Sequence, residues 1–548
     1  MAVKQPGTAR PRMLGHPLVF WLGAAACTAG VLLHLPMYIQ ARPMHYAMRG
    51  MPPDAPMLTG MALIVIGLAA TVYAVLPRRS GEIGSAVSRL RVRALDEAPI
   101  TRRHVLLVLV LMVAVTIDVM KPTALSFVAP GVAAEYGLKS PADPHGGLPV
   151  SWLPLCGITG TVLGSWLWGW FGDRIGRRAS ILVAGMVFTS SSICGAMPEF
   201  TWNLAMCFVM GLGAGGMLPI AYALLAETVP ARHRGWLMVL IGGDIAVAYV
   251  LTSWLSAALT PTFSWRILWL IGLPTGLLLL SLNRWIPESP RFLLATGHHR
   301  EAQEVLAGYG AAVVDTDEQE ATRHDAATRD PGGYLALFRG RLRGPTLAVA
   351  VLGIGIGLVT YGFQQWIPTN LRSLGYTAAG SDYVTRNAAV IGLPLTVLCA
   401  WMYGKLGSRK TLITVSSLTG AGLLAFPVAG DSLAHHHTLL ALLLVVPLAG
   451  SSSVVAVVAG YATEIYPTLV RARGAGLTAG MTKAGGVLIL ALAVAAAQVP
   501  SIATTAWIGA VPLLLAAVVF LWVGPETRRR NLEEINDVLM AAEKSASP

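Results

Sequence analysis

Residues 227–234 read Glu-Thr-Val-Pro-Ala-Arg-His-Arg, and residues 464–471 read Glu-Ile-Tyr-Pro-Thr-Leu-Val-Arg. Both stretches follow the pattern Glu-x-x-Pro-x-x-x-Arg, at an offset of 237 residues. The dipeptide Pro-Glu stands at 287–288 and again at 525–526, an offset of 238 residues in the same order. Such repetition indicates a duplicated chain, and paired halves are one way in which membrane transport proteins form a central site in the middle of the bilayer.

The composition around this repeat requires a lipid environment. Hydrophobic residues make up 54% of the 548 residues and charged residues only 12%, whereas a soluble domain has about 25% charged residues. The net charge is +12, but the basic residues gather in short segments between apolar runs. That distribution orients membrane proteins, and it argues against a nucleic-acid-binding surface.

The apolar runs are long enough to cross a bilayer, since a membrane-spanning helix needs about 20 mostly apolar residues. We count fourteen such runs, and they predict an all-α membrane protein. Their ranges are 18–35, 57–76, 105–133, 149–171, 179–198, 201–226, 236–262, 267–282, 346–370, 387–403, 411–430, 438–463, 475–501 and 502–524.

Basic residues mark every second loop between these runs as cytoplasmic. The segment 77–104 alone carries seven arginines, whereas the alternate loops carry few basic residues. An even number of spans then places both termini in the cytoplasm, and we expect a multi-pass protein of the cell inner membrane. The first run follows Arg10 and Arg12 and could instead be a cleaved signal peptide, but its length and the polar residues after Pro36 favour a retained span.

The last twelve runs divide into two groups of six, on either side of a long polar segment. We therefore expect five regions along the chain. These are an N-terminal two-helix extension with a basic linker (1–103), a first six-helix bundle (104–284), a cytoplasmic linker (285–344), a second six-helix bundle (345–524) and a cytoplasmic tail (525–548).

Residues 169–178 read Gly-Trp-Phe-Gly-Asp-Arg-Ile-Gly-Arg-Arg. This run resembles the signature loop between the second and third core helices of the major facilitator superfamily. Residues 287–291 and 524–528 resemble signatures of the sugar-porter or metabolite–proton symporter type, and 364–368 resembles the seventh helix of sugar and organic-ion members. The resemblance covers about 105–535. It implies a twelve-helix core in two pseudo-symmetric six-helix bundles, working by alternating access, to which the N-terminal pair is an addition.

The chain also departs from the family pattern. The fourth core helix usually carries an arginine ahead of its glycines, where this chain has Cys207. A proton-coupling role of that arginine therefore cannot be transferred. The second-half copy of the signature loop, 404–410, lacks its aspartate, and two extra spans precede the twelve.

The resemblance implies that charges around the signature loop latch the cytoplasmic side when the central cavity faces outward. Glycines let the helices approach closely at a tight turn, and the arginines can pair with nearby acids. Exposed ion pairs contribute only about 0–1 kcal/mol each, so these charges could instead do no more than set topology. The candidate latch residues are Gly169, Gly172, Asp173, Arg174, Gly176, Arg177, Arg178, Glu227, Arg234, Glu288 and Arg291 in the first half, and Arg409, Glu464, Arg471 and Glu526 in the second.

Four charged residues fall inside the fourteen runs: Asp118, Lys121, Asp244 and Lys483. Each costs about 2.5–3.5 kcal/mol at the centre of a spanning helix, so each is a candidate for the cavity. Asp118 and Lys121 lie three residues apart and hence on one helix face. Asp118 could carry the proton, and Lys121 could hold it charged until an anionic substrate competes for the lysine. The alternative is a structural ion pair between two helices.

The other two charges allow similar roles. Lys483 could meet a substrate carboxylate or pair with an acid such as Asp118. Asp244 follows Gly242-Gly243 in the cytoplasmic half of its span, and it could carry a proton or belong to the latch.

Two neighbouring glutamines are candidates for substrate binding. Gln364 and Gln365 offer both donors and acceptors in the outer half of the seventh core helix, and Tyr361 and Trp366 flank them. The alternative is hydrogen bonding between helices, with an aromatic belt at the membrane surface.

Together these patterns predict a proton-coupled symporter for a small polar metabolite, and the lysines favour an organic acid. Sugar symport, proton-driven efflux and a transporter-like sensor whose N-terminal pair docks a protein partner are the alternatives. There is no nucleotide-binding glycine loop, and the cysteines and histidines form no metal-ligand pattern. We therefore expect no enzymatic activity, cofactor, metal or nucleic acid, and expect the substrate, protons and the lipid bilayer as partners.

Overall fold

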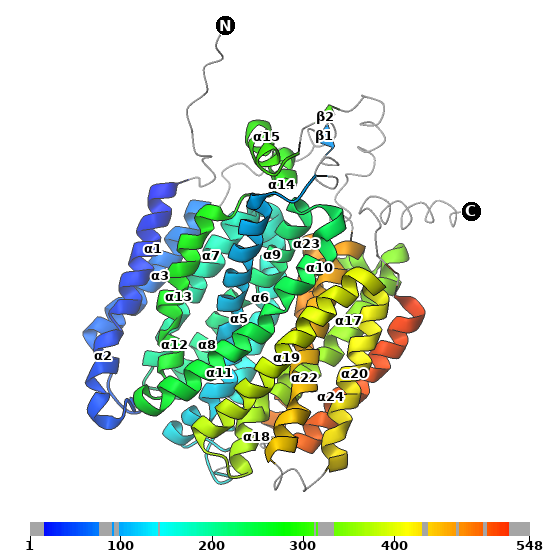
Figure 1. Ribbon diagram of the computed structural model, residues 1–548. Coiled ribbons are helices and arrows are strands. Elements are labelled where there is room, and N and C mark those ends of the chain that lie inside the picture. Colours follow the sequence, from blue (N-terminus) through cyan, green and yellow to red (C-terminus); the bar gives the residue numbers. More distant parts are fainter. Residues whose placement is uncertain are drawn as a thin grey trace.

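Long apolar helices lying side by side make up most of the computed structural model (Figure 1). An apolar segment in lipid must satisfy its backbone hydrogen bonds internally, and a helix does so. Over the residues that the structure describes, thirteen helices are long and apolar enough to cross a membrane. Those residues are 16–75, 90–91, 98–140, 143–296, 298–311, 314–315, 334–429, 437–466, 471–496, 501–524 and 526.

One expected span is absent from these thirteen. The run 149–171 forms helix α6 (Trp152–Ile175), which is 24 residues long but rich in glycine, threonine and tryptophan. Protein covers much of it, because it packs between α8 (Phe200–Ala214) and α23 (Arg471–Ala495). The total of fourteen spans therefore stays a prediction.

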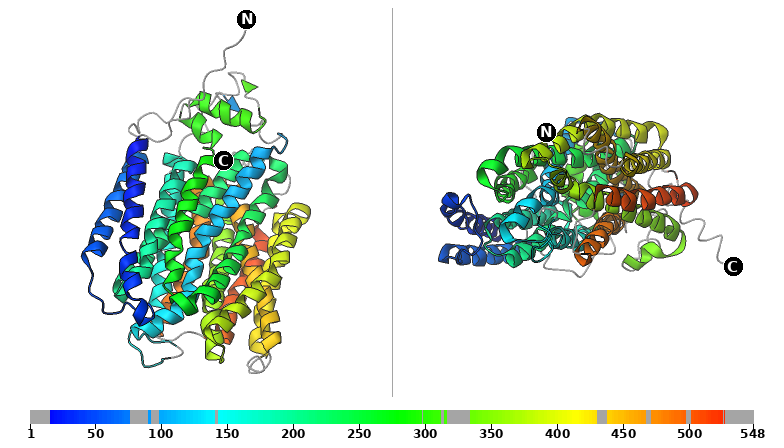
Figure 2. Two further views of the ribbon diagram at one scale, coloured as in Figure 1. Left: turned by 60° about the vertical axis from the view of Figure 1, so that its left-hand side comes forward. Right: turned by 90° about the horizontal axis from the view of Figure 1, so that it is seen from below.

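A helical pair precedes the two bundles and lies on one flank of the molecule (Figure 2). Its main helices touch at glycines, since a β-carbon on Gly30 would stand 2.6 Å from the Gly60 carbonyl oxygen and one on Gly23 would stand 2.7 Å from that of Gly67. Close backbone approach of this kind is a common way to pack helices in a membrane. The pair consists of α1 (Pro17–Leu32), α2 (Leu35–Gln40), the 3₁₀ turn η1 (Arg42–Met44) and α3 (Ala55–Val75).

One carboxylate makes several of the contacts between the pair and the first bundle, and Tyr38 of α2 also donates to the Phe263 carbonyl oxygen at 2.7 Å. Glu135 Oε1 accepts hydrogen bonds from the backbone N–H groups of Met48, at 2.8 Å, and Arg49, at 3.2 Å. The same oxygen lies 2.6 Å from Nη2 of Arg266, whose side chain is fully buried, and Trp265 donates to the other oxygen at 2.9 Å. The loop of the pair and two elements of the first bundle therefore share one acid.

Several helices of the first bundle are interrupted at glycines. The expected span 201–226 is divided into α8 and α9 at Gly215-Gly216, and the span 236–262 is divided into α10 and α11 at Gly243. The elements are α5 (Arg102–Tyr136), α6, α7 (Arg177–Ser190) with η3 (Ser191–Ala196), α8, α9 (Met217–Thr228), α10 (Ala231–Gly242), α11 (Asp244–Phe263), α12 (Ile267–Leu270), α13 (Gly272–Leu282) and η4 (Asn283–Trp285).

Short elements lie over one end of the bundles, above the helix ends (Figure 1). They are α14 (Pro290–Ala295), α15 (His299–Gly308) and a two-residue antiparallel pair of β1 (Leu90–Arg91) with β2 (Val314–Asp315). We call this the α15 end, and the opposite end, where α18 lies, the α18 end.

The second bundle repeats the first but contains a different interruption. Its first helix changes from α-helical to π-helical and then to 3₁₀ geometry over residues 359–366, and π segments are frequent at functional sites. The elements are η5 (Tyr334–Phe338), η6 (Gly340–Leu342), α17 (Arg343–Leu358), η7 (Val359–Phe363), η8 (Gln364–Trp366), α18 (Ile367–Ser373), α19 (Ala378–Leu406), α20 (Ser408–Ala429), α22 (His437–Ile465), α23 and α24 (Ile502–Val523).

Replacing Gly30 by leucine is expected to separate α1 from α3 and to lower the thermal unfolding midpoint of the purified protein. The leucine would meet the Gly60 backbone, and overpacking of this kind costs about 1–3 kcal/mol. Ala29→Leu is the matched control, because Ala29 is the preceding residue and is exposed. Equal midpoints for the two variants would contradict the tight contact.

Candidate functional site

The centre of the molecule brings one acid and one lysine together across the two bundles. Lys483 of α23 donates a 2.9 Å hydrogen bond from Nζ to Oγ of Ser165 in α6, so this bond joins the second bundle to the first. Asp118 of α5 is 3% exposed and interacts electrostatically with Lys483. The structure thus brings together two of the four charges expected in the membrane.

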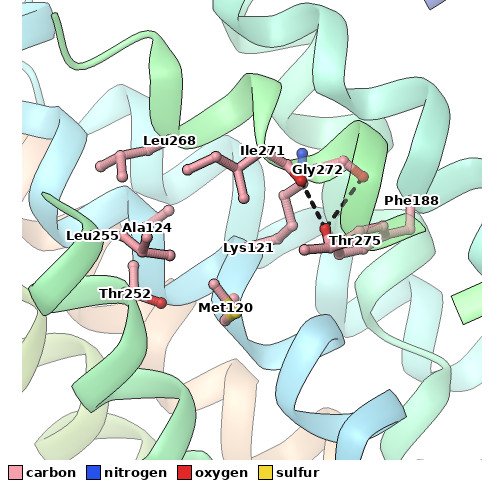
Figure 3. A pocket seen from close by; sticks show the side chains of 10 residues that line it. All are labelled: Met120, Lys121, Ala124, Phe188, Thr252, Leu255, Leu268, Ile271, Gly272 and Thr275. Carbon is pink, nitrogen blue, oxygen red and sulfur yellow. Dashed lines mark hydrogen bonds between the residues drawn. The ribbon is translucent and has the colours of Figure 1, made fainter. Parts of the chain in front are cut away.

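Lys121 does not join this centre. Its Nζ donates at 3.1 Å to the Trp269 carbonyl oxygen and lies 5.1 Å from the centre of the Phe188 ring. Figure 3 shows it beside Gly272 and Thr275, lining a pocket inside the first bundle with about 20 Å³ of space for water. A cavity holds one water in about 10–15 Å³ of such space, so a metabolite does not fit there.

The expected pairing of Asp118 with Lys121 is therefore corrected. Among the described residues, the cation that interacts electrostatically with Asp118 is Lys483. A separation of three residues placed both side chains on one half of the helix surface, but it left open how far each is turned toward the neighbouring helices.

The interrupted helix of the second bundle carries the candidate substrate residues. Gln364 Oε1 accepts a 3.0 Å bond from Ser451 of α22, and its carbonyl oxygen accepts a 3.4 Å bond from Tyr249 of the first bundle. The side-chain nitrogens of Gln365 and Trp366 are buried and have no hydrogen-bond partner. A buried unsatisfied donor is costly, so these two N–H groups are candidates for contact with a ligand.

Tyr361 lies beside the same region. Its ring packs on α23, where a β-carbon on Gly486 would stand 2.3 Å from the ring, and Gly486 is one turn beyond Lys483 along α23. The glycine thus makes room for the tyrosine next to the lysine.

Asp244 stands at the break between α10 and α11 and is 3% exposed. Its Oδ2 is buried without a hydrogen-bond partner, and the residue interacts electrostatically with Tyr222 of α9. A β-carbon on Gly243 would stand 2.4 Å from Thr396 of the second bundle. Asp244 therefore lies near the interface between the bundles, but separately from Asp118 and Lys483 as far as the described contacts show.

A buried charge cluster lies at the α15 end of the first bundle. Arg177 Nη2 lies 3.0 Å from Glu227 Oε1, and the two side chains are 7% and 1% exposed. Glu288 accepts backbone N–H bonds from Arg177, at 2.7 Å, and Arg178, at 3.2 Å. These N–H groups belong to the first turn of α7, where the helix dipole also favours an anion. Burial raises the pKa of the Glu288 carboxyl, and the N–H groups oppose that rise.

The second half repeats this carboxylate cap. Glu526 accepts backbone N–H bonds from Ser408, at 2.9 Å, and Arg409, at 3.3 Å, in the first turn of α20. A glycine with positive φ precedes each cap, Gly176 at +92° and Gly407 at +100°. A β-carbon on Gly176 would stand 2.5 Å from the Glu288 carboxylate, and one on Gly407 would stand 2.7 Å from the Glu526 carboxylate. The recurrence of Pro-Glu in the sequence thus corresponds to one helix-capping geometry that is built twice.

The other candidate latch residues have varied positions. Arg234 is 4% exposed and donates to the Val229 carbonyl oxygen at 3.2 Å. Glu464 accepts a 2.7 Å bond from Tyr403, and Arg409 also donates to the Leu521 carbonyl oxygen.

Three further residues belong to the signature loop and the end of α6. Arg174 is exposed, and its Cζ lies 4.2 Å from the centre of the Trp170 ring. Gly169 and Gly172 are buried, and the Gly172 carbonyl oxygen accepts a 2.8 Å bond from Arg177. The side chains of Asp173, Arg291 and Arg471 lie outside the described residues.

A buried acid at the α18 end was not predicted from the sequence. Asp382 of α19 accepts a 2.7 Å bond from Ser256 of α11. We had begun the corresponding span at residue 387, so Asp382 was counted with the loop. The polar sequence Gly-Ser-Asp-Tyr at 380–383 hid a helix that starts at Ala378.

Paired helical bundles, repeated charge clusters and a lysine between the bundles define a multi-pass membrane transporter of the major facilitator superfamily. Residues 129–539 match the family model described as sugar (and other) transporter, and the chain belongs to that family.

Relatives and a solved structure agree with this assignment. The niacin transporter NiaP of Acinetobacter baylyi is 26% identical, over 81% of this chain and 99% of the relative. The 4-hydroxybenzoate transporter PcaK of the same organism is 25% identical, over 76% of this chain and 87% of the relative. A structure of the proton:xylose symporter XylE bound to 6-bromo-6-deoxy-D-glucose aligns with a TM-score of 0.63 at 20% identity, over 80% of this chain and 99% of that one. It shares the fold.

Replacing Glu288 by alanine is expected to destabilise the α15 end, because two N–H groups of α7 lose their acceptor. An unsatisfied buried group costs about 1–3 kcal/mol, which thermal unfolding of the purified protein would detect. Glu288→Gln keeps one acceptor oxygen and should cost less. Glu304→Ala is the control, since Glu304 is exposed on α15, and an equal loss in that variant would contradict the capping role.

Proposed function

We propose that this protein is an inner-membrane symporter that moves a small aromatic monocarboxylate together with a proton by alternating access. The observation that carries the proposal is Lys483, a cation held between the two bundles beside Asp118. A lysine inside a membrane is costly, and in such a position it usually serves a substrate or ion pathway.

Competition for this lysine would couple the two cargoes. While Asp118 is ionised it neutralises Lys483, and the attraction between Lys483 and a substrate carboxylate is weak. When Asp118 takes up a proton, Lys483 loses its counter-ion and attracts the anionic substrate. Substrate and proton therefore load together, and the lysine takes the role that the sequence had suggested for Lys121.

The groups around Lys483 suit an aromatic acid. The free N–H donors of Gln365 and Trp366 could receive carboxylate or hydroxyl oxygens, and the Tyr361 ring offers an aromatic surface. The names of NiaP and PcaK state niacin and 4-hydroxybenzoate as their substrates, and both compounds are aromatic acids. Xylose, which XylE carries, is neutral and would leave Lys483 without a counter-charge when Asp118 is protonated.

We further propose that the α15 end is cytoplasmic, with both termini on that side and the five regions divided as expected. The basic segments of the sequence support this orientation. The charge clusters at this end would act as the latch, because a few kcal/mol suffice to shift a two-state equilibrium. The N-terminal pair, held by Glu135, would move with the first bundle, and a protein partner could dock on its lipid-facing side.

The transport proposal is tested in proteoliposomes with labelled niacin, 4-hydroxybenzoate and xylose. Uptake of an aromatic acid is expected, driven by an inward proton gradient and abolished by a protonophore. Lys483→Met should lower kcat/KM for the acid about thirtyfold or more, because removing one partner of a buried charge pair costs about 2–5 kcal/mol. Lys405→Met, at an exposed lysine of α19, should leave uptake unchanged.

Replacing Asp118 by asparagine should abolish gradient-driven uptake but preserve counterflow, since exchange does not require proton release. A sensor would show no counterflow in any variant. Xylose uptake that Lys483→Met leaves intact would refute the anion proposal, and loss of proton coupling in Asp244→Asn alone would move that role to Asp244.

Sidedness is tested by cysteine labelling in intact cells. Leu148→Cys lies in the exposed segment between α5 and α6, and a membrane-impermeant maleimide should label it from outside. Gln303→Cys, exposed on α15, should react only after lysis. The native cysteines are buried except for half-buried Cys156, which is replaced by serine, and the reverse labelling pattern would invert the proposed topology.

A further inference from the structure

A carboxylate joins the two bundles at the α18 end. Asp382, near the start of α19, is 2% exposed, and Ser256, in the last two turns of α11, is fully buried. Oγ of Ser256 donates to Oδ2 of Asp382 at 2.7 Å. A hydrogen bond to an ionised group is stronger than one between neutral groups, so this bond is a strong polar contact between the two bundles.

The second bundle orients the carboxylate from its own side. Oδ1 of Asp382 accepts a 3.3 Å bond from Ser381 and lies 3.9 Å from Nη2 of Arg372. Arg372 in turn donates from Nε to Ser381 Oγ at 3.4 Å. One oxygen of Asp382 is therefore held by its own bundle, and the other faces the first bundle.

Ser256, whose Oγ also lies 3.4 Å from Oγ1 of Thr260, behaves differently from Thr252 and Ser253 of the same helix. Thr252 donates to the Ala248 carbonyl oxygen at 2.7 Å, and Ser253 donates to that of Val250 at 3.0 Å. These bonds to a preceding turn are the usual choice for a serine or threonine inside a helix. Ser256 instead donates across the interface, so its side chain serves the contact between bundles.

Tyr249 links this bond to the candidate substrate residues. Tyr249 lies two turns from Ser256 on the same helix and hence on the same side of it. It donates to the Gln364 carbonyl oxygen at 3.4 Å and interacts electrostatically with Asp382. Tyr249 thus connects the candidate substrate residues with Asp382.

We infer that Ser256 and Asp382 form the gate that closes the α18 end, with Arg372 as the residue that positions the carboxylate. The inference rests on the alternating-access part of the proposed function, and it does not depend on which substrate is carried. The bond must break each time the bundles separate at this end. It therefore sets part of the balance between the open and closed states of the empty carrier.

Distances between spin labels on the purified protein test the gate. The labels are placed at Leu148→Cys and Leu374→Cys, which are exposed positions in the two halves near the α18 end, with Cys156 replaced by serine. Without any ligand, Ser256→Ala and Asp382→Ala should each shift the ratio of short to long distances about tenfold toward long distances. A charge-assisted bond is worth about 1.5–3 kcal/mol, and 1.4 kcal/mol is tenfold.

The double variant and a neighbouring serine supply the controls. Since both single changes remove the same bond, Ser256→Ala with Asp382→Ala should shift the ratio no further than either alone. Ser253 lies about one helical turn before Ser256 and bonds within its own helix, so Ser253→Ala should leave the distances between the labels unchanged. If the Asp382 variant does not fold, the comparison of Ser256→Ala with Ser253→Ala still tests the gate.

Three results would overturn the gate: unchanged distances in Ser256→Ala, an equal shift in Ser253→Ala, or additive shifts in the double variant. Because the labels report opening without substrate, failure of aromatic-acid uptake would leave this test valid. A shift in Ser256→Ala combined with absent uptake would separate the two proposals.

Discussion

A charge in the hydrocarbon core of a bilayer costs about 2.5–3.5 kcal/mol even on a lenient scale. Each charged side chain inside the molecule therefore needs a partner that offsets this cost. Lys483 satisfies it by donating to Ser165 and lying near Asp118. Lys121 satisfies it with a backbone carbonyl and two aromatic rings. The first solution depends on a residue of the partner bundle, whereas the second lies within one bundle. Under the proposed alternating access, the surroundings of Lys483 would therefore change and those of Lys121 would not.

Much of the architecture follows from elementary properties of the sequence. Apolar runs of sufficient length predicted the spanning helices, because lipid leaves the backbone little alternative. The recurrence of Pro-Glu predicted two related halves, and the structure shows why that dipeptide is repeated: Glu288 and Glu526 each cap the first turn of a helix behind a left-handed glycine.

Side-chain direction and helix interruptions could not be predicted from pattern alone. The spacing of Asp118 and Lys121 placed both on one helix face to within a third of a turn. The two side chains nevertheless have different partners, because Lys121 contacts the Trp269 carbonyl oxygen and Asp118 interacts with Lys483. The break at Gly215-Gly216 occurs inside a run without charged residues, and the break at Gly243 directly precedes the one charge of its run, Asp244. Asp382 was missed because hydropathy assigns a polar first turn to the loop, although a helix in a protein interior can begin with polar residues when another helix supplies a partner.

The attachment of the N-terminal helices to Glu135 makes the two halves unequal. Among the described residues, the first bundle carries a helical pair that the second lacks, so under the proposed alternating access it would displace more lipid for the same tilt. On that proposal the bilayer would resist movement of the first bundle more than movement of the second, and the second bundle would make the larger excursion relative to the membrane. Alternating access in this chain would then be unequal, with most of the movement in the second bundle.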